Sequence, residues 1–216
     1  MQKLDTQYAG LADSYYLAAL PFLEKAVKPK DLGTLQCFAL IAQYSLLTPT
    51  RTAAYWVVGL ASRLCQELGI TEEKSIASVR KYQSQFNAIE IDMRRRLFWI
   101  ITSVEFGLSH SLGRPSSFGT TFDHINVCFF ETVDDRFITP AGVLPGSPLS
   151  MKKWIAIHFF RMRLLQAEIR RKLYLKKRPE PKTDQDPWFL EMERKLNDWR
   201  YSSPKNDEGS GLSETW

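Results

Sequence analysis

Apolar residues recur every three or four positions along most of the chain, which is the spacing that buries one face of an α-helix. No stretch of more than a few residues alternates apolar and polar positions as a half-buried strand does. The pattern predicts six main helices, within residues 4–22, 31–46, 48–70, 94–112, 150–173 and 186–201. We therefore expect an all-α protein, an irregular multi-helix bundle with a long loop between the fourth and fifth main helices.

Helix-start and helix-stop residues fit these bounds. The predicted N-caps share a short side chain whose oxygen can accept a hydrogen bond from the first turn: Asp31, Thr50, Ser150 and Asp186. Pro187 strengthens the last start, because proline is favoured at the first helical position. Gly69 and Gly113 are expected to end the third and fourth helices, and residues 114–149 hold most of the following Gly and Pro as a long loop.

The apolar residues that recur at helical spacing also predict which side of each helix is buried. The second helix is expected to bury one side, consisting of Leu35, Phe38, Ala39, Ala42 and Leu46. The third has the line Trp56, Leu60, Leu64 and Leu68, and the fourth has Leu97, Ile101, Val104, Leu108 and Leu112. The fifth has Trp154, Ile155, Phe159, Met162, Leu165, Ile169 and Leu173. Gly59 and Ala61 would allow another helix to approach the third closely.

Composition is that of an ordinary globular protein. The 216 residues are 44% hydrophobic and 25% charged, enough for one large domain or two small ones. We expect a regulatory helical domain over residues 1–201 and a flexible tail over 202–216. The net charge of +5 is weak evidence for an anionic partner. No apolar run reaches the length of a membrane span, and the N-terminus lacks the apolar core of a signal peptide.

Metal and catalytic sites have little support in the sequence. The three cysteines and three histidines are isolated from one another, with no ligand spacing: Cys37, Cys65, Cys128, His110, His124 and His158. This argues against a disulfide framework and a structural zinc site. His158 is expected to be a core or boundary histidine. No nucleophile elbow, phosphate-binding glycine loop or paired carboxylates indicate an enzyme.

Two basic runs are the remaining candidates for chemistry. Arg94–Arg96 are consecutive, so a helix spreads them over about 200° and they cannot all face one phosphate groove. Glu90, Asp92 and Glu105 stand at helical spacing and can pair with some of them, which favours an ion-paired first turn over nucleic-acid contact. The run at 170–178 ends a helix, where the dipole favours cations, although nuclear import or nucleic-acid contact is the alternative.

The order of the segments resembles a known family. The stretches are "DLGTLQCFALIAQYSLLTPTRTAAYWVVGLASRLCQELGI", "EIDMRRRLFWIITSVEFGLSHSLGRPSSF", "DDRFITPAGVLP" and "IHFFRMRLLQAEIRRKLY". Together they closely resemble the fungal-specific transcription factor domain, the middle homology region of zinc-cluster (Zn2Cys6) transcription factors. Phe98 stands where that family often has a second Trp, which keeps a bulky aromatic residue.

The resemblance implies a bundle of packed helices within a nuclear DNA-binding regulator. The family reads DNA through six closely spaced cysteines in an N-terminal zinc cluster, and this chain lacks that motif. We therefore expect an excised regulatory domain with no cofactor of its own, zinc being expected only in the absent DNA-binding domain. We likewise expect the activation segment, which in this family usually lies at the far C-terminus, to be outside this chain. The resemblance assigns no catalytic residues, and we expect no enzyme.

The function predicted from the sequence is effector sensing within a transcription factor, in the nucleus. The candidate effector pocket comprises Trp99, Phe106, His110 and Arg114, and the alternative is that all four lock the loop 114–149 onto the bundle. Expected partners are a small-molecule effector, a co-regulator or a second copy, with DNA reached only through the absent zinc cluster and no membrane. The rival function is a helical interaction scaffold that binds a co-regulator or a second copy and no small molecule.

Overall fold

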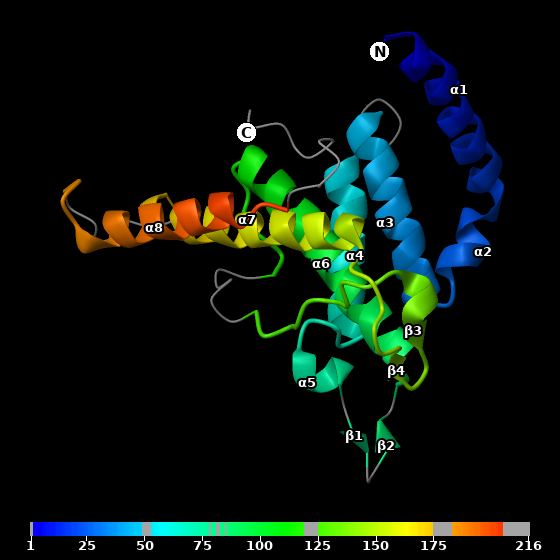
Figure 1. Ribbon diagram of the computed structural model, residues 1–216. Helices are drawn as coiled ribbons and strands as arrows, with labels where there is room; N and C mark the ends of the chain where they lie inside the picture. The colour runs from blue at the N-terminus through cyan, green and yellow to red at the C-terminus, as the bar shows by residue number, and fades with distance from the viewer. Residues whose placement is uncertain are drawn as a thin grey trace. The chain divides into compact units, whose positions relative to one another are not determined.

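The computed structural model describes residues 2–48, 53–77, 79–80, 83–84, 86–118, 125–174 and 183–204 (Figure 1). The chain divides into two compact units, residues 1–69 and 70–216, and each is described by itself. The expectation of a single regulatory domain over residues 1–201 stays a prediction. Helices make up most of the described chain, so the all-α prediction is confirmed. None of these helices combines the length and the apolar content that a bilayer span requires.

The first unit consists of helices, which are in chain order α1 (Gln2–Ala19), η1 (Leu20–Phe22), α2 (Leu23–Val27), α3 (Leu32–Leu47) and α4 (Ala54–Glu67). The helices α3 and α4 lie side by side in Figure 1. Tyr44 of α3 stacks on Tyr16 of α1 with ring centroids 4.2 Å apart, and its hydroxyl donates to the Asp13 carboxylate. These contacts hold α1 against α3.

Both predicted ends that can be examined in the first unit are confirmed. Asp31 caps α3, its carboxylate accepting a hydrogen bond from the Thr34 amide at 2.9 Å. Gly69 follows Leu68, the C-cap of α4, with φ at 66°, a conformation that glycine adopts without steric cost. Thr50, the predicted cap of α4, lies outside the described residues, and Ala53 takes the N-cap position without a side-chain hydrogen bond.

The predicted apolar stripe of α4 is wrong by one residue at its start. Trp56 is 63% exposed and Leu60 is half-buried. The buried face instead consists of Val57, Val58, Ala61, Ser62, Leu64 and Cys65. Small and branched side chains form this face, which suits close packing between helices, whereas an indole there would hold the helices apart. Gly59 is not a close-approach point, because a Cβ there would meet nothing within 4 Å.

The face predicted for α3 is confirmed only in part. Leu35 and Ala42 are buried, but Leu46 is 43% exposed. Thr34 and Ser45 are buried instead, because their hydroxyls donate to the backbone carbonyls of Ala26 and Ile41. Polar residues with local partners therefore widen the buried face beyond the apolar stripe.

The second unit is built around one long helix. Its elements are α5 (Glu73–Ile76), β1 (Val79–Arg80), β2 (Gln83–Ser84), α6 (Ala88–Ser111), η3 (Asp135–Phe137), β3 (Ile138–Thr139), β4 (Gly142–Val143), α7 (Met151–Leu173) and α8 (Pro187–Tyr201). The strands form two short antiparallel pairs, β1 with β2 and β3 with β4. Figure 1 shows α7 crossing α6, with α8 lying along α7. The predicted long loop between α6 and α7 contains η3, β3 and β4.

The helix α6 has strong signals at both ends. The Asn87 side chain accepts from the Glu90 amide at 3.0 Å and the Glu90 carboxylate accepts from the Asn87 amide at 3.1 Å, a reciprocal capping box. Gly113, just beyond the helix, has φ at 64°. Leu97 and Ile101 are buried as predicted, whereas Leu112 is 51% exposed. The predicted stripe therefore fails in the last turn of the helix.

The predicted inner face of α7 is wrong at three of its seven residues, while the other four are half-buried. Ile155, Phe159 and Leu173 are each 37% exposed. The buried residues are instead Ile157, His158, Phe160, Ala167 and Arg170. Polar and charged side chains occupy the inner face because they find partners there, as described below. Apolar spacing could not identify such a face.

The helix α8 begins where the sequence predicts and packs on α7. Asp186 accepts a hydrogen bond from the Trp188 amide at 2.9 Å, and Pro187 is the first helical residue. The Trp199 indole stacks on His158 with centroids 4.6 Å apart, and its Nε1 donates to the His158 carbonyl at 2.8 Å. His158 is 6% exposed, which confirms the prediction of a core or boundary histidine.

Candidate functional site

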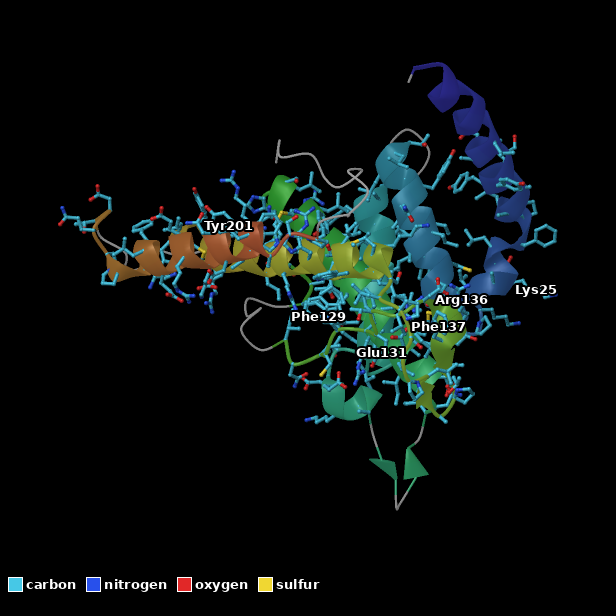
Figure 2. All side chains as sticks on the ribbon, viewed as in Figure 1. Lys25, Phe129, Glu131, Arg136, Phe137 and Tyr201 are labelled. Carbon is cyan, nitrogen blue, oxygen red and sulfur yellow. The ribbon has the colours of Figure 1, made fainter. Side chains whose placement is uncertain are left out.

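Trp99 stands at the centre of a cluster of rings rather than on an open surface. Its side chain is 3% exposed, and its Nε1 donates to the Cys128 carbonyl at 3.1 Å. Phe129, labelled in Figure 2, stacks on the indole with centroids 4.4 Å apart. Phe160 of α7 stacks with the same indole at 6.0 Å. Trp99 therefore connects residues 128–129 of the long loop, and also α7, to α6.

Phe106 and His110 form a second, separate ring pair about two to three turns further along α6. Phe106 is 3% exposed, whereas His110 is exposed, and their centroids are 6.2 Å apart. Arg114 follows the end of the helix, with its backbone amide donating to the Ser109 carbonyl at 2.8 Å. The structure thus brings Phe106 together with His110, and it assigns Trp99 to a different cluster.

A buried carboxylate on α6 fixes the loop that follows the helix. Glu105 is 1% exposed and accepts three hydrogen bonds, from the hydroxyls of Ser109 and Ser116 and from the amide of Ser117, at 2.8, 2.7 and 2.7 Å. Two of these three donors, Ser116 and Ser117, belong to the loop 114–118, so this carboxylate ties the loop to the helix.

This role of Glu105 is not visible in the sequence, which suggested that Glu105 could pair with the arginine run. That expectation is wrong because Glu105 lies about three helical turns beyond Arg94, out of reach of a side-chain contact, whereas Ser109 is one turn further along the same face. The signal that could have found it is a carboxylate inside a long apolar stretch, followed by serines at positions 109, 116 and 117. A buried charge needs several donors, and short serine side chains and loop amides provide them.

Arg96 holds a small ion-pair network on the other end of α6. It donates to Asp92, one turn earlier, at 2.6 Å, and to Asp135 of the loop at 2.8 Å. Lys153 of α7 also reaches Asp135, at 2.8 Å. Hydrogen bonds from Arg96 and from Lys153 lower the pKa of Asp135 to about 2. The network joins α6, the loop and α7. The backbone amide of Glu131, labelled in Figure 2, adds a further link from the loop to α6, since it donates to Asp92 at 2.6 Å.

The other two arginines of the run also have partners within the second unit. Arg95 donates to Glu73 of α5 at 2.5 Å, and the Cys128 amide donates to the same carboxylate at 2.8 Å. The Arg94 guanidinium lies over the Phe86 ring, 3.7 Å from its centroid, and burial lowers its pKa. All three side chains of the run are thus engaged internally, in agreement with the ion-paired interpretation and not with a phosphate-binding groove.

Two arginines of α7 face the C-terminal half of α6. Arg163 lies against Gly107, where a Cβ would come within 3.4 Å of its Nη2. Arg170 is 7% exposed, and its Nη2 donates to the Arg114 carbonyl at 3.0 Å. Arg170 is the first residue of the predicted basic run at 170–178, so at least this residue of the run is buried and makes an internal hydrogen bond. Residues 175–178 lie outside the described residues.

Side chains that could bind a metal ion do not gather in the described part of the chain, where no group of three His, Cys, Asp or Glu residues has suitable geometry. Cys65 is buried, and burial raises the pKa of its thiol to about 12, so it stays protonated. Cys128 is exposed. His124, the remaining histidine considered from the sequence, lies outside the described residues.

Comparison with known proteins identifies relatives of one kind. The family model described as fungal specific transcription factor domain matches residues 2–201. The pyrimidine pathway regulatory protein 1 of Saccharomyces cerevisiae is 31% identical over 82% of this chain and 19% of its own length. The positive regulator of purine utilization of Emericella nidulans is 24% identical over 91% of this chain and 23% of its own length. The chain thus spans about a fifth of these relatives. No solved structure matches it.

Proposed function

The chain belongs to the fungal specific transcription factor domain family, and on this premise we propose that it is the effector-sensing regulatory domain of a fungal zinc-cluster transcription factor. It would control transcription without itself carrying the DNA-binding motif. The names of the relatives, which are regulators of pathways rather than enzymes, support this proposal. The same support leads us to propose action in the nucleus, no catalytic activity, and zinc and DNA contact only through a separate zinc-cluster domain.

The observation that supports regulation is the way the loop 114–118 is held to α6. One buried carboxylate accepts three hydrogen bonds from Ser109, Ser116 and Ser117, and one arginine holds the Arg114 carbonyl. A hydrogen bond to a charged group contributes about 1.5–3 kcal/mol. A bias of about 1–3 kcal/mol changes an equilibrium roughly 5–150-fold. Phe118 of the same loop also packs on Phe98, with ring centroids 5.8 Å apart. An effector or partner that binds better when the loop is released would act against these contacts.

The experiment compares two serine variants in the full-length factor. Ser116→Ala removes a donor to Glu105, whereas Ser111→Ala is the matched control, since the Ser111 hydroxyl donates only to the Gly107 carbonyl of its own helix, at 2.9 Å. We expect Ser116→Ala to change reporter output several-fold per molecule of protein, with promoter occupancy unchanged, and Ser111→Ala to leave both unchanged. Protein abundance is measured in parallel, because destabilisation alone lowers output.

Output that follows abundance in both variants would contradict a switch at this loop and favour the second candidate function, a helical interaction scaffold. Exposed apolar side chains on α8 support that candidate. Leu190 is 71% exposed and Tyr201, labelled in Figure 2, is 77% exposed. If they bind a second copy, the purified chain should sediment as a dimer, and Leu190→Glu should convert it to a monomer.

A further inference from the structure

The loop that follows α6 carries an exposed serine beside the buried carboxylate. Ser117 is exposed, and its backbone amide donates to Glu105 Oε1 at 2.7 Å. Residues 114–116 belong to no helix or strand, and Pro115 restricts the residue before it to an extended conformation. Irregular surface segments of this kind are the ones that other proteins can reach. Ser117 is therefore open to modification by an enzyme.

An arginine lies three residues before this serine. Protein kinases distinguish their substrates partly by charge, and the fork of an arginine pairs with carboxylates in a kinase cleft. Three described hydroxyl residues have an arginine at this spacing, namely Ser117, Thr139 and Ser203. Thr139 is half-buried in β3, where its hydroxyl donates to the Gly142 carbonyl at 2.7 Å. Ser203 is half-buried and precedes the buried Pro204, so of the three only Ser117 is exposed.

The neighbouring serines are poorer targets. Ser116 is half-buried, and its hydroxyl is engaged by Glu105 at 2.7 Å. Ser111 is exposed but belongs to α6, and the residue three positions before it is Leu108. Exposure, irregular backbone and an arginine at the right spacing therefore coincide at Ser117.

A phosphate on Ser117 would bring two anions together. Phosphoserine carries about −1.5 to −2 charges near pH 7. The Ser117 amide nitrogen lies 2.7 Å from the Glu105 carboxylate, and bond lengths limit a phosphorus on the same residue to about 5 Å from that nitrogen. The two anions would thus stay within about 8 Å, roughly one Debye length at physiological salt. Glu105 is 1% exposed and its three described donors are neutral, so in the described part of the chain no cation pairs with it to offset the repulsion.

We propose that Ser117 is the phosphorylation site of an arginine-directed serine kinase, and that the phosphate releases the loop 114–118 from Glu105. In this step Ser117 Oγ forms a bond to the γ-phosphorus of ATP, and the bond between that phosphorus and ADP breaks. The hydroxyl proton passes to the carboxylate base of the kinase. As control of the transcription factor, this modification rests on the function proposed above; as a site on the chain, it does not.

The first test treats the purified 216-residue chain with ATP, magnesium and calcium/calmodulin-dependent protein kinase II, an enzyme that selects an arginine at this spacing. Fragment mass spectrometry locates the phosphate, which we expect on Ser117. Arg114→Gln should lower the initial rate by about tenfold or more, since a charge-assisted contact with the kinase is lost. Arg136→Gln is the matched control, because Arg136 precedes Thr139 at the same spacing and should leave the rate at Ser117 unchanged. Phosphate on other residues only, or equal rates in the two variants, would overturn the site.

The second test measures the release of the loop. Phosphorylation should increase the native-state hydrogen exchange rate of the Ser117 amide by about tenfold or more in the wild type. The increase should be smaller in Glu105→Gln, whose side chain is neutral, and this comparison cancels the direct effect of the phosphate on the neighbouring amide. Unchanged or slower exchange in the wild type would mean that the docked loop accommodates the phosphate, for example beside Arg170, and would overturn the release. Equal increases in the two proteins would overturn the role of Glu105 in it.

The outcome separates this site from the proposed function. Phosphorylation of Ser117 that releases the loop, together with reporter output unaffected by Ser116→Ala, would leave the modification site standing and contradict the regulatory loop. A reporter response to Ser116→Ala, together with no phosphate on Ser117, would leave the regulatory function standing and overturn the site.

Discussion

Two tryptophans in helices with apolar spacing have opposite environments. Trp99 of α6 is 3% exposed and Trp56 of α4 is 63% exposed. The difference lies in long-range partners: Trp99 meets Phe129 and Phe160, which are distant in sequence. The apolar spacing on each helix is similar, so spacing alone could not distinguish them. At this scale the sequence predicts which types of residue tend to be buried, but it does not predict which of two tryptophans is the buried one.

Trp99→Ala should lower the free energy of unfolding of the second unit by about 3–5 kcal/mol, the usual cost of truncating a buried aromatic side chain. The variant loses the ring contacts and leaves the Cys128 carbonyl without its indole donor. Trp56→Ala removes the same side chain from an exposed position and should cost less than about 1 kcal/mol. Urea denaturation of the two variants gives the comparison. Equal losses would show that Trp99 does not hold the core together.

His158 should make stability depend on pH. Burial, and then the nearby charge of Arg161, lower the pKa of His158 below that of a free imidazole, and its Nδ1 has no partner in the described structure. The unfolded chain therefore binds a proton more readily than the folded one, so stability is complete above about pH 6.5 and is lost as the pH falls below that value.

The measurement is the free energy of unfolding between about pH 7.5 and 5.5. The wild type should lose more stability over this range than His158→Phe, which keeps a ring against Trp199 but cannot be protonated. Identical slopes for the two proteins would mean that the imidazole is hydrated in the folded state.

Element ends could be predicted from the sequence, whereas inner faces could not. Asp31, Asp186 and Gly69 act where predicted, because caps depend on a few neighbouring residues. The inner face of α7 includes His158 and Arg170, whose burial depends on partners in α8 and in the loop after α6. No local pattern indicates those partners. The same reason explains why Glu105 was missed as the residue that holds the loop.

Replacing Glu105 should loosen the loop 114–118, and the effect should be larger when the new side chain has no oxygen that can accept a hydrogen bond. Glu105→Ala removes the acceptor of three hydrogen bonds and should increase the exchange rate of the Ser117 amide by about tenfold or more. Glu105→Gln keeps one oxygen for that amide and should increase the rate much less. Native-state hydrogen exchange measures both. Equal rates in the two variants would show that the loop is held by other contacts.

The charge distribution of the whole chain determines what it can bind. A net charge of +5 is compatible with some attraction to nucleic acid. The side chains that suggested such contact most strongly, Arg94–Arg96, are directed to Phe86, Glu73, Asp92 and Asp135. An ion-paired guanidinium presents little net field to a phosphate. The basic run Arg94–Arg96 is therefore part of the internal framework of the second unit.

It follows that the purified 216-residue chain should bind DNA weakly and without sequence preference. The remaining attraction would come from exposed cations, and each phosphate contact releases counterions, so affinity should fall steeply between about 50 and 200 mM salt. Specific binders hold their sites typically 10³–10⁷-fold more tightly than random DNA, and we expect the ratio here to be close to one. Fluorescence anisotropy with two unrelated duplexes at several salt concentrations measures both quantities. A tight and sequence-selective complex at physiological salt would mean that Arg94–Arg96 leave their partners to read DNA, and the proposed division of labour with a separate zinc-cluster domain would fail.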